Sequence, residues 1–282
     1  MDASHKDHDE QAARWNGPSG HAWVDLQQVL DGMFRPFEEL LVRAVSEEGA
    51  ARVLDVGCGT GAVTRAVARR TGHCVGADIS APMIAAAREL AEQEGVPASF
   101  VHADVQEHDF GTGVFDTVVS RFGVMFFPDP VRAFTRLRGA VRDGGGLRLV
   151  VWRGPEENPF MTTAERAAAP FVPDLPARRP DQPGQFAFAD PDRVRGILRE
   201  SGWSDVVLRP VDPVCALPEK DLERYVTRLG PLGTILPQAD ERTRAEVVDA
   251  VRPAFEPFVQ GTEVRYTAAC WEISARAGAN VS

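Results

Sequence analysis

The sequence predicts an α/β fold: a doubly wound, mainly parallel seven-stranded sheet with helices on both faces, N-terminal helices and a cap formed by C-terminal insertions. Three observations predict it. Strand-like and helical segments alternate about every 20 to 25 residues between residues 52 and 152, which implies right-handed crossovers and a parallel sheet. A glycine-rich turn follows the first strand-like segment, and the alternation resumes at Asp190.

Seven segments have the length and apolar character of strands. They are residues 52–56, 74–77, 99–103, 114–120, 147–152, 206–208 and 264–274. Residues 142–146, with three consecutive glycines, are expected to form a turn before the fifth strand. Ser80 and Asp190, each with a proline in the following helical turn, are expected N-caps. Between residues 23 and 45 apolar side chains recur at steps of three and four, which predicts a helical stripe, broken near Gly32 or Pro36.

The charge of the chain argues against a nucleic-acid partner. The net charge is −10, from 31 Lys and Arg against 41 Asp and Glu. A protein that neutralises phosphates needs a basic face, and the densest basic clusters here are pairs at 69–70 and 178–179. The N-terminal residues have neither region of a signal peptide, and no stretch approaches the ~18 apolar residues of a membrane span. We therefore expect a cytoplasmic protein without a membrane partner.

The cysteines give no sign of a metal site. Cys58, Cys74, Cys215 and Cys270 are far apart and lack the spacing of metal ligands. They are expected to be reduced, structural thiols, and no metal is expected. The chain has only two lysines, whereas Arg, Ala and Gly are abundant. This composition indicates a GC-rich bacterial genome.

Chemistry-bearing residues follow the first four predicted strands. Ligands of an open α/β sheet bind outside the carboxyl ends of its strands, and residues 55–61, Asp78, Asp104 and the pair 120–121 fall at such ends. Glycines within 55–61 permit a tight turn and a close approach to a ligand. Asp78 has the position of the acid that accepts both ribose hydroxyls in dinucleotide sites.

Residues 53–61, Val-Leu-Asp-Val-Gly-Cys-Gly-Thr-Gly, closely resemble the first motif of the class I S-adenosylmethionine-dependent methyltransferases. That family includes ubiquinone/menaquinone and many natural-product methyltransferases. The likeness continues in Asp-Ile-Ser-Ala-Pro-Met at 78–83, in His-Ala-Asp-Val at 102–105, over residues 115–123 and in the glycine turn at 144–147. It covers residues 50–152 strongly and the rest weakly.

The resemblance implies S-adenosyl-L-methionine as cofactor, S-adenosyl-L-homocysteine as product, and no metal. It implies that Asp55 faces the ammonium group, Asp78 the ribose and Asp104 the adenine amino group. The other residues expected to contact the cofactor are Trp15, Gly57, Gly59, Thr60, Ile79, Met83, Val105 and Ser120.

The resemblance also suggests a division of one domain over residues 1–282. Residues 1–48 form an N-terminal helical segment, and residues 49–152 form the cofactor-binding core. Two irregular, proline-containing stretches, 153–189 and 212–262, form a substrate cap, and residues 190–211 and 263–282 complete the sheet.

Taken singly, the three acids have simpler interpretations. Asp55 is also typical of a turn, Asp78 of a helix cap and Asp104 of a loop, and Asp116 is interpreted as structural. Two other function classes stay open. One is an NAD-dependent dehydrogenase, against which Asp55 and the G-x-G-x-G spacing speak, and the other is a non-catalytic sensor or interaction protein that keeps cofactor affinity.

The acceptor side is expected to be apolar or planar. Trp23, Phe34, Arg121, Phe122 and Met125, with the following two phenylalanines, are expected to line it. Arg121 either holds a substrate carboxylate or pairs with a buried acid.

The first candidate for a general base is His21; the others are His102, His108, Tyr225 and Tyr266. The sequence does not specify whether oxygen, nitrogen or carbon accepts the methyl group. The expected partner is a small, partly apolar acceptor, secondary-metabolite or quinone-like, and the expected state is a monomer or homodimer.

Overall fold

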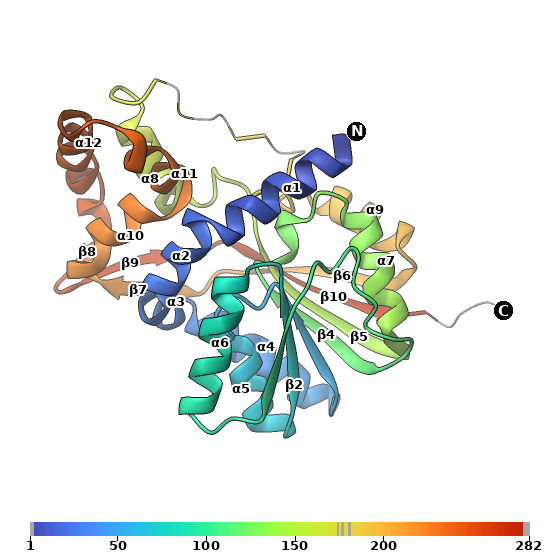
Figure 1. Ribbon diagram of the computed structural model, residues 1–282. Helices are drawn as coiled ribbons and strands as arrows, with labels where there is room; N and C mark the ends of the chain where they lie inside the picture. The colour runs from blue at the N-terminus through green and yellow to red at the C-terminus, as the bar shows by residue number, and fades with distance from the viewer. Residues whose placement is uncertain (1–2, 174, 176–177, 180–181, 279–282) are drawn as a thin grey trace.

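The computed structural model describes residues 3–173, 175, 178–179 and 182–278. Seven strands form the main sheet. They are β1 (Val53–Val56), β2 (Cys74–Asp78), β3 (Ala98–His102), β4 (Phe115–Arg121), β5 (Val141–Trp152), β6 (Trp203–Val211) and β10 (Cys270–Ala277). Their order is β3-β2-β1-β4-β5-β10-β6 (Figure 1). Strands β1 to β5 pair in parallel, and β10 runs antiparallel to β5 and β6. The predicted fold class is confirmed.

Five helices cover the main sheet. They are α4 (Arg35–Glu48), α5 (Ala62–Thr71), α6 (Ala81–Gln93), α7 (Pro130–Ala140) and α9 (Pro191–Glu200). Helices α5 and α6 connect strands on one side of β1 and α7 connects strands on the other, so right-handed crossovers place them on opposite faces. The Ser80 hydroxyl accepts from the Met83 N–H, and the Asp190 carboxylate accepts from the Asp192 and Arg193 N–H groups. Both predicted N-caps are confirmed.

The N-terminal segment forms three further helices; of their boundaries the sequence analysis expected the break near Gly32 or Pro36, which the structure has at Phe34. These helices are α1 (Ala3–Asn16), α2 (Pro18–Asp25) and α3 (Gln27–Met33). The predicted stripe is interrupted at Leu26 and Phe34, where single residues join α2, α3 and α4. Helix α1 carries few apolar residues, and hydrophobic periodicity therefore gave no signal for it.

A second, smaller sheet and several helices stand at one end of the molecule (Figure 1). Its antiparallel strands have the order β7-β9-β8. The elements are β7 (Val214–Pro218), β8 (Val259–Gln260), β9 (Glu263–Thr267), α8 (Pro159–Ala168), α10 (Leu222–Arg228), α11 (Gly230–Ile235) and α12 (Glu241–Ala254). Four short 3₁₀ helices occur among the described residues: η1 (Val124–Phe126), η2 (Glu219–Asp221), η3 (Leu236–Gln238) and η4 (Glu256–Phe258).

Two strand predictions were wrong in extent. The single strand expected over 264–274 is two strands, β9 and β10, in different sheets. Ala268 and Ala269 join them, and small apolar residues give no break signal. The turn expected over 142–146 belongs to β5, whose register against β4 shifts between Phe115 and Thr117 to accommodate the extra residues.

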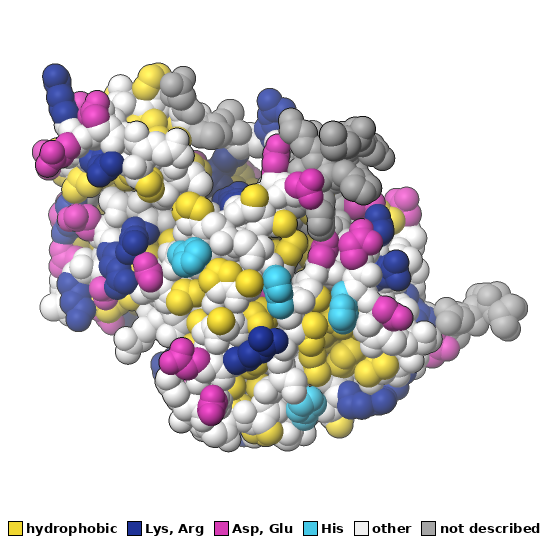
Figure 2. All heavy atoms as spheres, viewed as in Figure 1, with side chains coloured by type: hydrophobic (Ala, Val, Ile, Leu, Met, Phe, Trp, Pro, Cys, Tyr) yellow, Lys and Arg dark blue, Asp and Glu magenta, His cyan; other side chains and the backbone are white. Residues whose placement is uncertain are grey.

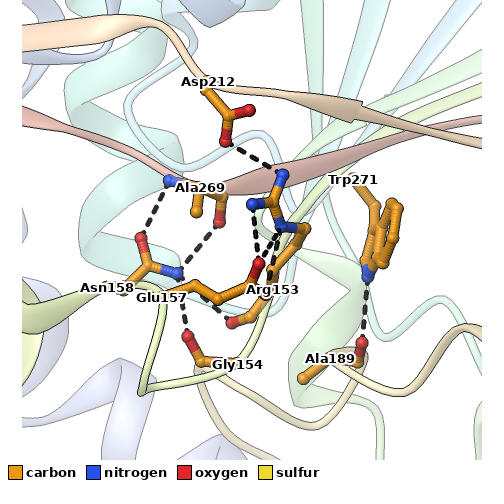
Figure 3. Close-up of polar contacts among 8 residues, drawn as sticks. All are labelled: Arg153, Gly154, Glu157, Asn158, Ala189, Asp212, Ala269 and Trp271. Carbon is orange, nitrogen blue, oxygen red and sulfur yellow. Dashed lines mark hydrogen bonds and ion pairs between the residues drawn. The ribbon is translucent and has the colours of Figure 1, made fainter.

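One polar cluster joins three of the four places where the chain passes between the main sheet and the cap (Figure 3). Arg153, after β5, pairs with Glu157 and lies 2.9 Å from Asp212, after β6. Asn158 is 1% exposed; its Nδ2 donates to the Ala269 carbonyl at 3.0 Å, and its Oδ1 accepts from the Ala269 N–H at 2.9 Å. Asn158 follows β5 and Ala269 precedes β10, so these hydrogen bonds connect the segment that leaves the main sheet for the cap with the segment that returns to it.

We predict that Asn158→Ala lowers the free energy of unfolding by about 2 to 4 kcal/mol, because it leaves the buried N–H and C=O of Ala269 without these partners. Urea unfolding measures the change. Glu200→Ala, at an exposed position, is the control and should shift stability by no more than about 0.5 kcal/mol. Equal stability of the two variants would contradict the role given to Asn158.

Candidate active site

The strand order reverses at β1, because β2 and β3 lie on one side of it and β4 and β5 on the other. Such a switch point leaves a crevice at the carboxyl ends of the strands. The loops after β1 and β4 meet there: a Cβ built on Gly57 would stand 2.6 Å from the Cα of Gly123. Gly57 also has φ +63°, in the region where glycine is favoured. Glycine at both positions therefore permits this backbone contact.

A cavity lies at this crevice and is lined by residues from four strand ends and the N-terminal helices. The lining residues are Gln11, Trp15, Trp23, Gly57, Gly59, Asp78, Ile79, Met83, Ala103, Asp104, Val105, Gln106, Arg121, Phe122, Gly123, Phe126, Phe127 and Pro128. Thirteen of them are predicted site residues: Trp15, Trp23, Gly57, Gly59, Asp78, Ile79, Met83, Asp104, Val105, Arg121, Phe122, Phe126 and Phe127. The structure thus brings together residues that span more than one hundred positions of the chain.

Asp78, the last residue of β2, is held by backbone N–H groups on both carboxylate oxygens. Gly59 donates to Oδ2 at 2.8 Å, and Ser80 donates to Oδ1 at 2.9 Å. Burial raises the pKa of Asp78, and these two hydrogen bonds offset part of the rise. Each carboxylate oxygen keeps a further lone pair, so a fixed bidentate acceptor faces the cavity.

Asp104 lies in the turn after β3. Its Oδ1 accepts from the Gln106 N–H at 2.8 Å, which fixes the carboxylate beside Val105. Gln106 in turn accepts from the Asp129 N–H, before α7. The sequence analysis missed Gln106, because a glutamine after an Asp-Val pair carries no general signal of a site.

Asp55 is placed below the cavity rather than in its lining. The side chain is 1% exposed and accepts from the Thr64 hydroxyl at 2.6 Å. Burial raises its pKa to about 7.

The end of β4 carries an unusual backbone conformation. Phe122 has φ +65°, which costs about 1–3 kcal/mol for a residue other than glycine. Its N–H donates to the Val150 carbonyl, and its ring stacks on Trp152 with the centroids 4.7 Å apart. These contacts stabilise the turn, and Arg121, Phe122 and Gly123 all line the cavity.

Six predicted site residues lie outside this lining. Thr60, in the glycine loop after β1, and Ser120, near the end of β4, are buried. Met125 is a core residue that is 1% exposed. The Phe34 ring packs against Phe37, Phe122 and Trp152. His21 is exposed, with Nδ1 2.9 Å from the Gly17 carbonyl oxygen. With Asp55, these residues do not reach the cavity surface, and their predicted roles in direct contacts stay predictions.

Comparison with known proteins identifies the family. A family model described as a methyltransferase domain matches residues 53–145. A demethylmenaquinone methyltransferase of Thermus thermophilus is 34% identical over 168 residues, which cover 56% of this chain and 76% of that protein. The chain belongs to the S-adenosylmethionine-dependent methyltransferase family.

Two other proteins are similar to this methyltransferase. An uncharacterized protein of Mycobacterium tuberculosis is 28% identical over 176 residues, 62% of either chain, so the match spans less than two thirds of that relative. The solved structure of a candidate methyltransferase of Bacillus halodurans superposes with a TM-score of 0.55 and 17% identity, covering 84% of this chain and 98% of that one. It supports the shared Rossmann-like fold.

The residues of this methyltransferase fit the cofactor of the family. A ribose needs acceptors for two hydroxyls, and Asp78 offers two fixed ones. A base needs an apolar slot with a polar edge, and Ile79, Met83 and Val105 with Asp104 provide it. The close contact of Gly57 with Gly123 removes the side chains that would fill the crevice.

The cavity is small for such a ligand. It encloses about 110 Å³, below the roughly 300 to 1,000 Å³ of typical ligand sites. Trp15 of α1 forms part of the wall, against Trp23 and Phe126. The Ser80 hydroxyl donates to the Trp15 carbonyl, which anchors this wall beside Asp78. Trp15 and Trp23 thus narrow the cavity in this structure.

None of the five candidate bases is among the described residues that line the cavity. His102 lies with Nε2 2.9 Å from the Ile79 carbonyl oxygen, and the His108 ring packs on Phe110. Tyr225, in α10, is partly buried and Tyr266, in β9, is buried; burial raises the pKa of both. The four cysteines are unpaired and buried, as expected.

Three further findings concern the described part of the chain. No group of three or more His, Cys, Asp or Glu side chains is arranged there to hold a metal ion. No helix there has the length and apolar character needed to cross a bilayer. On the face in Figure 2, basic and acidic side chains are interspersed.

We predict that Gly123→Ala disrupts the crevice. Gly123 has φ −74°, so alanine meets no backbone strain, but its Cβ would stand 2.7 Å from the Gly57 Cα. We expect a loss of about 1 to 3 kcal/mol of stability and at least tenfold weaker binding of S-adenosylhomocysteine by calorimetry. Gly139→Ala is the matched control, since nothing lies within 4 Å of its Cβ position in α7; it should be neutral or stabilising. Normal cofactor affinity in Gly123→Ala would contradict the steric argument.

A second prediction follows from Asp55. An unfolded aspartate has a pKa of about 3.9, so the folded chain keeps the Asp55 proton between about pH 4 and 7 while the unfolded chain has lost it. Stability therefore falls as pH rises through that window, by at most about 4 kcal/mol. Asp55→Asn should remove this component, as measured by urea unfolding at pH 4.5 and 7.5. An identical pH dependence in both proteins would contradict the raised pKa.

Proposed function

We propose that this protein transfers the methyl group of S-adenosylmethionine to an oxygen, nitrogen or carbon atom of a small, partly apolar metabolite, secondary-metabolite or quinone-like. The observation that carries the proposal is the Asp78 carboxylate, fixed by the Gly59 and Ser80 N–H groups at the wall of a largely apolar cavity. The proposal extends to a soluble, cytoplasmic monomer or homodimer with residues 153–189 and 212–262 as substrate cap.

The adenosine half of the cofactor is assigned to the ends of β2 and β3. Asp78 accepts the two ribose hydroxyls, Ile79 and Met83 flank the adenine, and Asp104 accepts from its amino group. These side chains lie in one lining, and the turn hydrogen bonds of Asp78 and Asp104 fix the carboxylates before a ligand arrives. Preorganised acceptors reduce the entropy lost on binding.

The sulfonium supplies an already activated methyl group for in-line displacement. The contribution of the chain is to position the acceptor and exclude water. Trp15, Trp23 and Phe126 form an edge-to-face aromatic wall over the crevice. An apolar or planar acceptor fits such a wall.

The lining also restricts the acceptor atom. Its described side chains that can take up a proton are Asp78 and Asp104, both assigned to the adenosine. The favoured acceptor is therefore a nucleophile with an available lone pair, such as an amine or azole nitrogen or an already ionised oxygen.

We predict that Asp78→Asn weakens S-adenosylhomocysteine binding by about 10- to 100-fold, because a charged acceptor of two hydroxyls is lost. Calorimetry measures the dissociation constant. Asp116→Asn is the matched control, since Asp116 binds the Ala51 and Arg52 N–H groups at the opposite end of β4. Asp116→Asn should lose stability and keep affinity. Wild-type affinity in Asp78→Asn would remove Asp78 from the ribose role.

The absence of a candidate base from the described lining favours testing a second function, a non-catalytic S-adenosylmethionine sensor. Methyl transfer to any member of a panel of quinols, phenols, amines and azoles would exclude the sensor. A parallel titration with NADH tests the dehydrogenase alternative, for which we expect no binding.

A further inference from the structure

We infer that Arg121 binds a carboxylate at the end of the cavity away from the adenine site. The carboxylate belongs either to the amino-acid part of the cofactor or to the methyl acceptor. The inference rests on the proposed function and deepens it, because the second source makes the acceptor an acidic metabolite.

Within the part of the chain that the structure describes, the guanidinium of Arg121 has no carboxylate in direct contact. Its Nη1 is buried and has no hydrogen-bond partner. Among the described residues, no carboxylate oxygen forms an ion pair with Arg121 within the 4.0 Å limit. Buried polar groups of proteins are almost always hydrogen-bonded, and a buried charge without a partner is more costly still. The side chain is therefore poised for a ligand.

The nearest acids do not fill this role. Glu38 of α4 and Asp55 of β1 are close enough for Arg121 to lower both pKa values. Burial nevertheless raises the pKa of each carboxyl above its usual value, and Asp55 is already engaged by the Thr64 hydroxyl. Neither acid forms a direct ion pair with Arg121 among the described residues, and both alternatives that the sequence left open for Arg121 stay predictions.

Arg121 rests on a rigid aromatic surface. Its Cζ lies 5.6 Å from the centroid of the Phe34 ring, within the range of a cation–π contact. Phe34 is fixed in turn by edge-to-face contacts with Phe122 and Trp152. A planar guanidinium held on a ring keeps its N–H edge for a carboxylate, which it binds in a bidentate manner. Phe34 thus supports Arg121 in this structure, and its expected role as a substrate contact stays a prediction.

The order of the strands places Arg121 opposite the adenosine site. Asp104 follows β3, Asp78 ends β2, the glycine turn follows β1 and Arg121 ends β4, in the order in which these strands lie across the sheet. A ligand with its adenine at Asp104 and its ribose at Asp78 therefore reaches Arg121 with its amino-acid part or meets the acceptor there.

The experiment compares the wild type with Arg121→Met, which removes the charge at similar length, and Arg121→Lys, which keeps the charge without the planar fork. Calorimetry measures binding of S-adenosylhomocysteine and of its decarboxylated analogue. A second set of titrations, at saturating S-adenosylhomocysteine, compares benzoate and indole-3-acetate with the corresponding amides. Thermal unfolding checks that each variant is folded. If Arg121→Met is not folded, the comparison of Arg121→Lys with the wild type provides the test.

If the carboxylate is the cofactor's, Arg121→Met binds S-adenosylhomocysteine at least about 30-fold more weakly, as expected for loss of a buried charge partner, and binds the decarboxylated analogue as the wild type does. If the carboxylate belongs to the methyl acceptor, Arg121→Met binds S-adenosylhomocysteine as the wild type does. The wild type then binds benzoate or indole-3-acetate more tightly than the corresponding amide, and Arg121→Met does not. Arg121→Lys should lose part of either effect.

Equal weakening of S-adenosylhomocysteine and its decarboxylated analogue, or no change in any titration, overturns the inference. Failure of the wild type itself to bind S-adenosylhomocysteine would instead overturn the proposed function, so the two failures are distinguishable.

Discussion

The site depends on one contact, the approach of the Gly57 backbone to that of Gly123 where the strand order reverses. A side chain on either residue would stand within 2.7 Å of the other's Cα. The contact draws the loops after β1 and β4 together, and the Gly59 N–H can then reach Asp78 on the next strand. The crevice, the fixed carboxylate and the position of Arg121 all follow from this short backbone distance.

The sequence predicted the core of the fold because local signals there agree with one another. The strand lengths, the N-caps at Ser80 and Asp190 and the glycine turn all indicate the same parallel sheet. The small sheet was not predicted, because β7 to β9 are short and β9 runs into β10 through two alanines. Helix α1 falls within the predicted N-terminal helical segment, but its bounds were not predicted, because the contacts of Trp15 and Asn16 with the loop after β2 leave no periodicity in the sequence.

The candidate site shows a similar division. Several residues within motifs, such as Asp78 and Asp104, line the cavity, because a motif fixes which strand end each occupies, whereas Asp55 is buried outside the lining. Of the residues chosen by type, Trp15 and Trp23 line the cavity and His21 and Phe34 do not, since side-chain direction depends on tertiary packing. Arg121 is an intermediate case. The sequence predicted its place at a strand end, but only the structure shows that its buried Nη1 has no hydrogen-bond partner among the described residues.

A crystal structure of the protein with S-adenosylhomocysteine tests the central claim most directly. The ribose hydroxyls should lie within hydrogen-bond distance of both Asp78 carboxylate oxygens, with the adenine beside Val105 and Asp104 and the Trp15 ring displaced from its present contact with Phe126. A ligand bound elsewhere, or an adenosine that makes no contact with Asp78, would contradict it.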